Sequence, residues 1–410
     1  MNKKTFCILP WVHTHLNTEG DVFPCCISWD TSRKARVGWI KDYTLEELFN
    51  NDFMKQLRLD MLNGVKREDV CSSCISREAS GFSSPRQSYN NDFAHDVENV
   101  ESITQPDGYV VPVIKSWDVR FSNQCNLKCR SCGTLFSSLW AQENKDNRNT
   151  ITPVDFNVRD PLEHQYQNVE KIYFAGGEPL IMPEHFRTLQ QLIDRGRADK
   201  IEIIYNSNMT VLNYNQHNLL DYWVKFKKIT IGASIDAMGP RAEYIRHRIP
   251  WKNIEQNLRK LIEYTKEHNN IDFYYSPTVG ILNIHHLCDM HQYLWNNNLM
   301  KYIDSILFNI LLYPEHYNCR ILPANIKDEI SKKIDSHIDW LKANNASSNT
   351  IDQYTNLKVY LNEESDKADL LKVFYSKTIA LDEKRNENLE KTFPEYAEMF
   401  TQLRAAHGTK

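Results

Sequence analysis

Three cysteines in the middle of the chain could hold a metal centre. The segment RFSNQCNLKCRSC, residues 120–132, places Cys125, Cys129 and Cys132 within eight residues. Iron–sulfur clusters are held by cysteine thiolates, and a [4Fe–4S] cubane normally takes four of them. With three thiolates offered, one iron stays open to another ligand. The alternative is a zinc site with its fourth ligand elsewhere, because zinc also takes cysteine-rich tetrahedral sites.

A second group of cysteines lies near the N-terminus. Cys7 is followed by twelve residues, Gly20, four more residues and Cys25, and a C-x2-C pair, Cys71 and Cys74, comes later. Four thiolates can complete one cubane, and they also suit structural zinc, so the spacing leaves both readings open. The other three cysteines are predicted to be buried packing residues: Cys26, Cys288 and Cys319.

Two glycines and a carboxylate follow a predicted strand at Gly176-Gly177-Glu178. Glycines let the backbone approach a ligand closely, and the adjacent carboxylate can receive an ammonium group. A tight turn with a solvated glutamate is the ordinary reading of the same residues.

The elements that must position these residues are strands that alternate with helices from about residue 110. Consecutive β/α units imply parallel strands with right-handed crossovers, which close into a barrel or form an open sheet. The cysteine triplet follows the first strand, at the edge where active sites of parallel α/β folds gather, and this placement argues against a plain zinc site. The predicted strands are 117–121, 171–175, 201–205, 228–235, 271–275 and 305–312, and the clearest helices begin near Pro183 and span 252–268.

The flanking regions are simpler. Residues 80–110 are rich in Ser, Asn, Asp and Gly and suit a linker, and residues 320–410 read as helices with a polar loop near 344–349. In the N-terminal region, Trp11, His13 and His15 lie near the N-terminal cysteines and could face a substrate. The ordinary expectation, which we prefer, places Trp11 in the core and the two histidines at the surface.

Composition limits the class of protein. The 410 residues are 41% hydrophobic and 25% charged, which is typical of a globular chain with a sizeable core. No apolar run approaches the ~20 residues that span a bilayer, and we expect a cytoplasmic protein with no membrane partner. The net charge of −4 and the lack of a basic run argue against nucleic acid.

The C-x3-C-x2-C spacing after the first strand resembles the signature of the radical S-adenosylmethionine (radical SAM) superfamily. The resemblance implies a partial (β/α)6 TIM-like barrel of α/β class, in which Cys125, Cys129 and Cys132 hold a [4Fe–4S] cluster whose open iron binds S-adenosylmethionine. One departure is Ser131, because the family usually has an aromatic residue there.

The same resemblance implies roles for residues at the other strand ends. Gly176, Gly177 and Glu178 look like the family's GGE motif, which meets the amino end of S-adenosylmethionine. Ser234 or Asp236 corresponds to a ribose contact, and Arg246 to an arginine that pairs with the carboxylate of S-adenosylmethionine; the alternative is a helix cap at Asp236 and a surface Arg246. These side-chain roles, with the three core cysteines, form the expected catalytic and cofactor site.

The N-terminal pattern resembles the SPASM domain, and more closely its half-sized relative, the twitch domain, which hold auxiliary [4Fe–4S] clusters. In those relatives the domain usually follows the core, whereas here it precedes it. The expected organisation is a small cysteine-rich, twitch-like domain at 1–95 with Cys7, Cys25, Cys71 and Cys74 as ligands, a radical SAM core at 110–315, and a helical extension at 316–410.

The resemblance implies an enzyme that reductively cleaves S-adenosylmethionine to a 5′-deoxyadenosyl radical and abstracts a substrate hydrogen atom. We expect a radical SAM oxidoreductase that oxidises or crosslinks a peptide or small metabolite and takes electrons from a partner such as flavodoxin or ferredoxin. The alternatives are a nucleotide- or nucleic-acid-modifying radical SAM enzyme, or a non-catalytic metal-stabilised binding protein.

Overall fold

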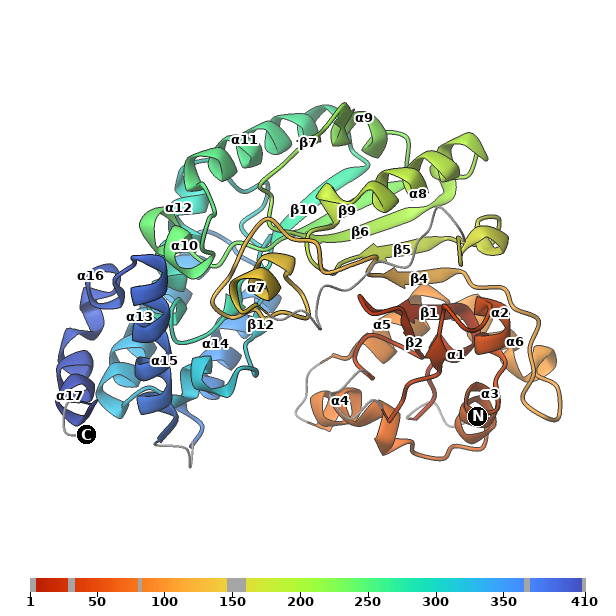
Figure 1. The fold of residues 1–410 in the computed structure, drawn as a ribbon, viewed down its shortest axis with the longest axis horizontal. Helices are drawn as coiled ribbons and strands as arrows, with labels where there is room; N and C mark the ends of the chain where they lie inside the picture. The colour runs from red at the N-terminus through yellow and green to blue at the C-terminus, as the bar shows by residue number, and fades with distance from the viewer. Residues whose placement is uncertain (1–4, 29–33, 80–82, 146–159, 365–368, 408–410) are drawn as a thin grey trace. The chain divides into compact units, whose positions relative to one another are not determined.

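The chain folds into two compact units in a computed structural model that describes residues 5–28, 34–79, 83–145, 160–364 and 369–407 (Figure 1). The first unit contains residues 1–125, 134–205 and 213–230, and the second contains 126–133, 206–212 and 231–410. The loop that carries the cysteine triplet therefore has Cys125 in the first unit and Cys129 and Cys132 in the second.

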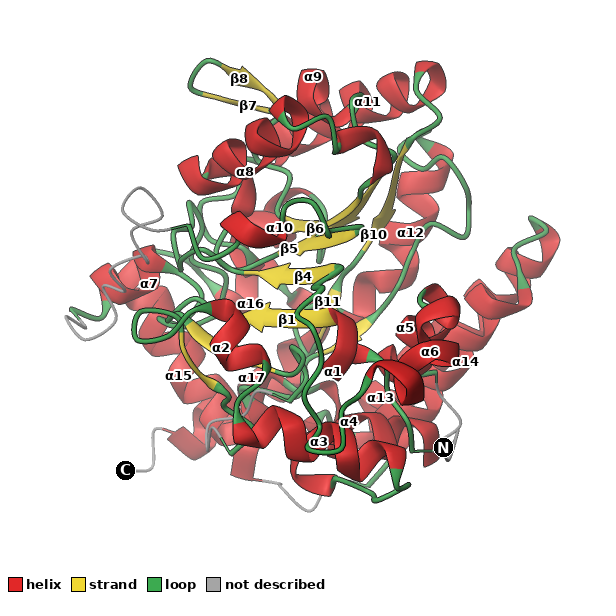
Figure 2. Cartoon of the chain, turned by 90° about the vertical axis from the view of Figure 1, so that its right-hand side faces the viewer, coloured by secondary structure: helices red, strands yellow, loops and turns green. Residues whose placement is uncertain are grey.

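An eight-stranded sheet has the order β10-β9-β6-β5-β4-β1-β2-β3. In the first unit β1, β4, β5 and β6 pair in parallel, and β1, β2 and β3 pair antiparallel. Figure 2 shows β4, β5 and β6 side by side. A mostly parallel sheet with intervening helices confirms the α/β class and the partial TIM-like barrel. The strands are β1 His13–Leu16, β2 Asp21–Phe23, β3 Gly38–Trp39, β4 Ser116–Val119, β5 Lys171–Phe174, β6 Glu202–Ser207, β9 Lys228–Ala233 and β10 Ile271–Tyr275.

The N-terminal segment belongs to this sheet. Strand β1 lies along β4, with His13 opposite Ser116 and Leu16 opposite Val119. The prediction that His13 and His15 lie at the surface is wrong, because pairing on both sides of β1 buries them to 2% and 1% exposure. Trp11 is in the core, as predicted.

Short capped helices fill the rest of the first unit. Thr44 and Glu47 form a reciprocal capping box at α2, and Ser84 and Gln87 form one at α5. The linker predicted at 80–110 is wrong over much of its length: the capping box begins α5 in a polar sequence, and α6 follows it directly without a side-chain cap. The strands β7 Asn213–Tyr214 and β8 His217–Asn218 form a separate two-stranded antiparallel sheet. The helices are α1 Leu9–Val12, α2 Leu45–Phe49, α3 Asp52–Leu62, α4 Glu68–Ala79, α5 Pro85–Asp92, α6 Ala94–Ile103, α7 Ser138–Glu143, α8 Pro183–Asp194 and α9 Leu219–Trp223.

The second unit is mainly helical. In α11 the residues Ile254, Leu258, Leu261 and Ile262 recur at helical spacing and are all buried, as predicted. The strand predicted at 305–312 shortens to β12, Asn309–Ile310, with an isolated bridge at Ile306. The helices are α10 Gly239–Ile245, α11 Trp251–Glu267, α12 Leu287–Asn296, α13 Ala324–Ala343, α14 Ser348–Asn362, α15 Asp369–Arg385, α16 Leu389–Thr392 and α17 Ala397–His407, and β11 Thr278–Val279 pairs with β12.

Among the helices of the described ranges, none has the length and apolar character needed to cross a bilayer.

Candidate functional site

Backbone hydrogen bonds hold the cysteine loop in place within the second unit. Lys128 N–H donates to the carbonyl of His247 at 3.2 Å, and Arg130 N–H donates to that of Ile245 at 2.8 Å. Cys129 and Cys132 are half-buried thiols, and Cys132 N–H donates to the Cys129 carbonyl at 3.0 Å. The loop is therefore a fixed structure that presents two thiols from one turn.

The electrostatics of these two thiols suit metal binding. Burial raises the pKa of Cys129, and the nearby Arg246 guanidinium opposes the rise. Burial, followed by the charge of Cys129, raises the pKa of Cys132 to about 12. The thiolate is the form that binds metal. A thiol whose anion is disfavoured by burial needs a nearby cationic centre, and the donor set fits an iron–sulfur cluster.

A buried ion pair lies beside Cys129. Arg246 Nε is 2.8 Å from Asp236 Oδ2, and Arg246 donates to Cys129 Sγ at 3.8 Å. Asp236 also accepts from the Thr278 N–H at 2.8 Å. The alternative of a helix cap and a surface arginine is wrong, because α10 has no side-chain cap and both residues are buried. Ser234 is half-buried near this pair in sequence, after β9.

A small hollow opens near the same loop. Its lining includes Ser131, Ile245, Thr278, Gly280 and Ile281. A Cβ on Gly280 would come 2.7 Å from the carbonyl oxygen of Tyr317, so only glycine fits there. The small side chain of Ser131 faces this hollow, at the position where the family usually has an aromatic residue.

In the first unit, the Gly176-Gly177-Glu178 turn is bound to the segment that enters the cysteine motif. Gly177 N–H donates to the Ser122 carbonyl at 3.3 Å and Glu178 N–H to the Gln124 carbonyl at 2.8 Å. A Cβ on Gly177 would lie 2.1 Å from the Gln124 carbonyl oxygen, and Gly176 has a φ of +122°.

The carboxylate of this turn is not solvated. Glu178 is 1% exposed, and its side chain accepts from the Leu180 N–H at 3.2 Å. The ordinary reading of the motif as a turn with a solvated glutamate is therefore wrong. Cys125, one residue after Gln124, is half-buried, and its N–H donates to Ser138 Oγ at 3.3 Å.

The four N-terminal cysteines form one cluster within the first unit. Cys71 and Cys74 are one helical turn apart on α4, and the charges of Cys25, Cys71 and Cys74 each raise the pKa of the buried Cys7, after the larger effect of burial. Burial also raises the pKa of Cys25 to about 11 and that of Cys71 to about 12.

The arrangement of these sulfurs can be compared with that of a zinc site. Zinc–sulfur bonds of about 2.3 Å in a tetrahedron hold neighbouring sulfurs about 3.8 Å apart. Among the residues that the structure describes, no three of these sulfurs lie within 4.8 Å of one another. The four thiols are therefore not arranged as a preformed zinc tetrahedron.

Pattern reasoning missed a row of buried polar residues on β1 and β4. His15 Nδ1 lies 3.2 Å from Asp118 Oδ1, and Arg120 Nε lies 3.5 Å from the same oxygen. The Cys26 thiol, predicted to be a packing residue, is half-buried and lies near Asp118, whose charge adds to the larger effect of burial in raising the pKa of the thiol. Cys288 and Cys319 are core thiols, as predicted. The alternation of Asp118 and Arg120 in one strand was the available signal for this row.

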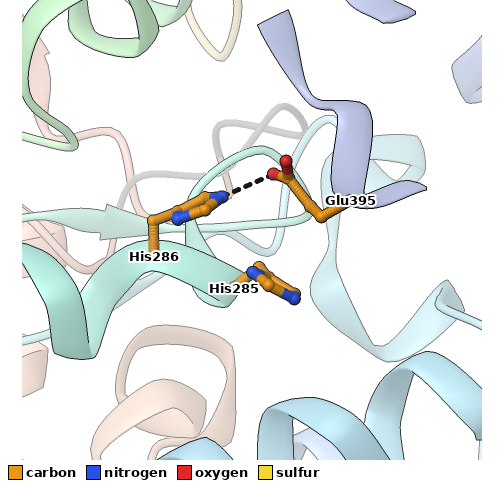
Figure 3. Close-up of side chains that lie close together, drawn as sticks. All are labelled: His285, His286 and Glu395. Atoms are coloured by element: carbon orange, nitrogen blue, oxygen red, sulfur yellow. Dashed lines mark hydrogen bonds and ion pairs between the residues drawn. The ribbon is translucent and has the colours of Figure 1, made fainter. Parts of the chain in front are cut away.

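A second missed cluster, His285, His286 and Glu395, places three metal-type ligand atoms within 4.8 Å of one another (Figure 3). His286 Nε2 is 2.5 Å from Glu395 Oε1, and Arg241 is 3.2 Å from the other carboxylate oxygen. Lys333 donates to the His285 carbonyl at 2.7 Å. Because two cations already neutralise this region, we interpret the cluster as an ionic network that binds the C-terminal segment.

Comparison with known proteins defines the class. Residues 119–291 match the family model described as the radical SAM superfamily, so the chain carries a radical SAM domain. Residues 7–75 match SPASM, described as an iron–sulfur cluster-binding domain. The chain therefore carries a radical SAM domain preceded by a SPASM domain, and the cofactors of these two domains are a [4Fe–4S] cluster, S-adenosylmethionine and an auxiliary iron–sulfur cluster.

Solved structures give a weaker likeness. One is described as native anSMEcpe with bound AdoMet and Cp18Cys peptide, with a TM-score of 0.41 and 16% identity over 58% of this chain. Another is hexahistidine-tagged anSMEcpe with bound AdoMet, with a TM-score of 0.41 and 18% identity over 58% of this chain. The chain spans 63% and 61% of the length of these two structures. No curated protein matches the sequence.

Proposed function

We propose that the chain is a radical SAM enzyme that oxidises or crosslinks a peptide or small metabolite. When bound, the core cluster and S-adenosylmethionine supply a 5′-deoxyadenosyl radical that removes a hydrogen atom from a substrate C–H bond. The observation that carries the proposal is the cysteine loop of Cys125, Cys129 and Cys132. A buried arginine outside the loop, Arg246, lies 3.8 Å from the Cys129 sulfur.

The protein's own residues would bind and orient these groups. Cys125, Cys129 and Cys132 would hold the core cluster, and three protein ligands leave one iron for the cofactor. Arg246 can offer guanidinium N–H groups to a carboxylate while Asp236 fixes its orientation at 2.8 Å. We expect Ser234 or Asp236 to contact the ribose.

The glycine turn would serve the other end of the cofactor. Gly176 and Gly177 allow close backbone approach, and the buried Glu178 carboxylate suits an ammonium group. Backbone hydrogen bonds from this turn to Ser122 and Gln124 fix it to the segment before Cys125. Burial of these polar groups excludes water from the reacting centre.

The N-terminal thiols Cys7, Cys25, Cys71 and Cys74 would hold the auxiliary cluster. Complete ligation by four thiolates leaves no iron open, which suits electron transfer rather than cofactor binding. Turnover also requires an external reductant, for which a flavodoxin or ferredoxin is the natural class.

The test is iron content together with 5′-deoxyadenosine formation under dithionite in anaerobically reconstituted protein. We expect about eight irons per chain, and about four after Cys125, Cys129 and Cys132 are all replaced by Ala. That triple variant should form no 5′-deoxyadenosine. The matched control replaces the buried thiols Cys288 and Cys319 by Ala and should keep both readouts. Retained 5′-deoxyadenosine formation in the triple variant would refute the core assignment.

A further inference from the structure

The contacts of the polar row on β1 and β4 define where it lies within the first unit. A Cβ built on Gly176 would meet Arg120 Cβ at 3.3 Å, so Arg120 lies against the glycine turn. Asp118, two residues before Arg120, lies near the Cys26 thiol, which adjoins Cys25 in sequence. The row therefore extends from the turn proposed for S-adenosylmethionine to a proposed ligand of the auxiliary cluster. A substrate of the proposed enzyme belongs in this position.

Charge within the row is balanced and fixed. Burial opposes ionisation of Asp118, but the nearby His15 and Arg120 outweigh it, and the pKa of Asp118 is lowered. Burial lowers the pKa of His15, so its imidazole is neutral. Asp118 and Arg120 then sum to no net charge. A lone charge added to this buried site would be uncompensated and costly, so a neutral polar group fits better.

Two hydrogen-bonding groups in the row remain available. The Nδ1 of His15 lies 3.2 Å from Asp118 Oδ1 without an aligned hydrogen bond, and the carboxylate charge there favours the tautomer with the proton on Nδ1, which leaves Nε2 as an acceptor. Within the described ranges, His15 Nε2 and the terminal nitrogens of Arg120 make no hydrogen bond. His15 is opposite Asp118 in the pairing of β1 with β4, and Arg120 follows two residues later, so a donor fork and a neutral acceptor lie on the same face of the sheet.

We propose that Arg120 and His15, positioned by Asp118, form the substrate-recognition site and bind an amide group. The Arg120 fork donates to the amide oxygen, whose two lone pairs can accept two N–H groups, and His15 Nε2 accepts from the amide N–H. This inference rests on the proposed function. The amide is that of a peptide backbone or of a side-chain carboxamide.

Calorimetric titration of the anaerobic holoenzyme with S-adenosylmethionine bound tests the site. The probes are N-methylacetamide for a backbone amide, propanamide for a carboxamide, and methyl acetate, the ester analogue of the first probe, which has no N–H. We expect at least one amide to bind about tenfold tighter than the ester, the effect of one such hydrogen bond. The tighter-binding amide identifies the source.

Variants separate recognition from folding. His15→Phe should bring the amide-to-ester ratio of affinities to about one, and Arg120→Gln should weaken both probes about tenfold. The control is His13→Gln, a buried histidine of the same strand that is already bonded to Ser116 at 2.9 Å, and it should keep the amide preference. A role of His15 in packing alone would weaken amide and ester equally.

Equal binding of amide and ester to the native enzyme, or binding of neither amide, would overturn the inference. 5′-Deoxyadenosine formation, measured without a probe on the same preparation, distinguishes failure of the recognition site from failure of the proposed function. If it persists while the amide preference is absent, only the recognition site falls. If it is absent from a preparation with full iron content, the proposed function fails.

Discussion

Replacing Asp382 by Asn should loosen the cysteine loop without unfolding the second unit. Arg130, between two of the core cysteines, is fully buried, and its NH2 group contacts both Asp382 and Glu387, the latter at 2.5 Å. Its guanidinium also lies 3.7 Å from the centroid of the Tyr244 ring. The last residues of α15 and the turn that follows therefore hold the loop from a distant part of the chain.

The free energy lost in this variant follows from the interactions that the substitution removes. Loss of the only partner of a buried charge costs about 3–5 kcal/mol. In Asp382→Asn the arginine keeps Glu387. The amide oxygen can keep the Leu389 N–H that Oδ2 now accepts, and the amide NH2 then replaces Oδ1, where the Tyr244 hydroxyl can accept from it instead of donating. The loss is then close to one charge-assisted hydrogen bond, about 2 kcal/mol. If this loss of free energy applies to the local opening of the loop, the population of the open loop rises about 30-fold.

The assay is the rate of iron release from the core cluster to an excess of chelator, in anaerobic protein whose iron content matches the native chain. We expect Asp382→Asn to release the core iron up to about 30-fold faster. The matched control is Glu363→Gln, which breaks the exposed Glu363–Arg320 pair at 2.8 Å and should change the rate little. A release rate within twofold of the native protein would refute the argument that this ion pair holds the loop.

Three further predictions test other parts of the structure. Gly177→Ala should lower S-adenosylmethionine affinity in equilibrium dialysis at least tenfold, because its Cβ would meet a carbonyl oxygen at 2.1 Å, whereas Gly133→Ala, with no atom within 4 Å, should not. Cys74→Ser should reduce iron from about eight to about four per chain while 5′-deoxyadenosine formation persists. Burial opposes protonation of His286, but its carboxylate neighbours raise its pKa, so its pairing stabilises the fold below about pH 6.5 and is lost as pH rises through the raised pKa. Glu395→Gln should lower that pKa in an NMR titration of the ring, and an unchanged titration would contradict the ionic network.

Local patterns allowed much of the fold and the cofactors to be predicted. The apolar repeat of α11 and the alternation of β9 indicated an α/β chain, because periodicity depends on neighbours in sequence. The cysteine spacings indicated two metal sites for the same reason, and the resemblance to radical SAM and SPASM proteins implied that both hold iron–sulfur clusters. The predicted linker at 80–110 was wrong because Ser84, a polar residue in a polar stretch, begins a capped helix instead of a loop.

Contacts distant in sequence could not be predicted this way. Asp118 and His15 are brought together only by the register of β1 against β4, which no local pattern specifies. Arg130 and Asp382 are 252 residues apart, and nothing near either residue indicates the other. Burial of His13 and His15 likewise depends on strand pairing rather than on the polarity of the residues themselves.

The pairing of β1 with β4 also constrains how the protein is made. Strand β1 leaves the ribosome about 100 residues before β4, and domains generally begin to fold during synthesis. The N-terminal thiols therefore emerge while one edge of β1 still lacks its parallel neighbour. Iron loading before that neighbour arrives would act on an incomplete sheet with an open strand edge, which invites aggregation. Slow translation between residues 75 and 119, or chaperone cover of that edge, should therefore govern the yield of fully loaded protein.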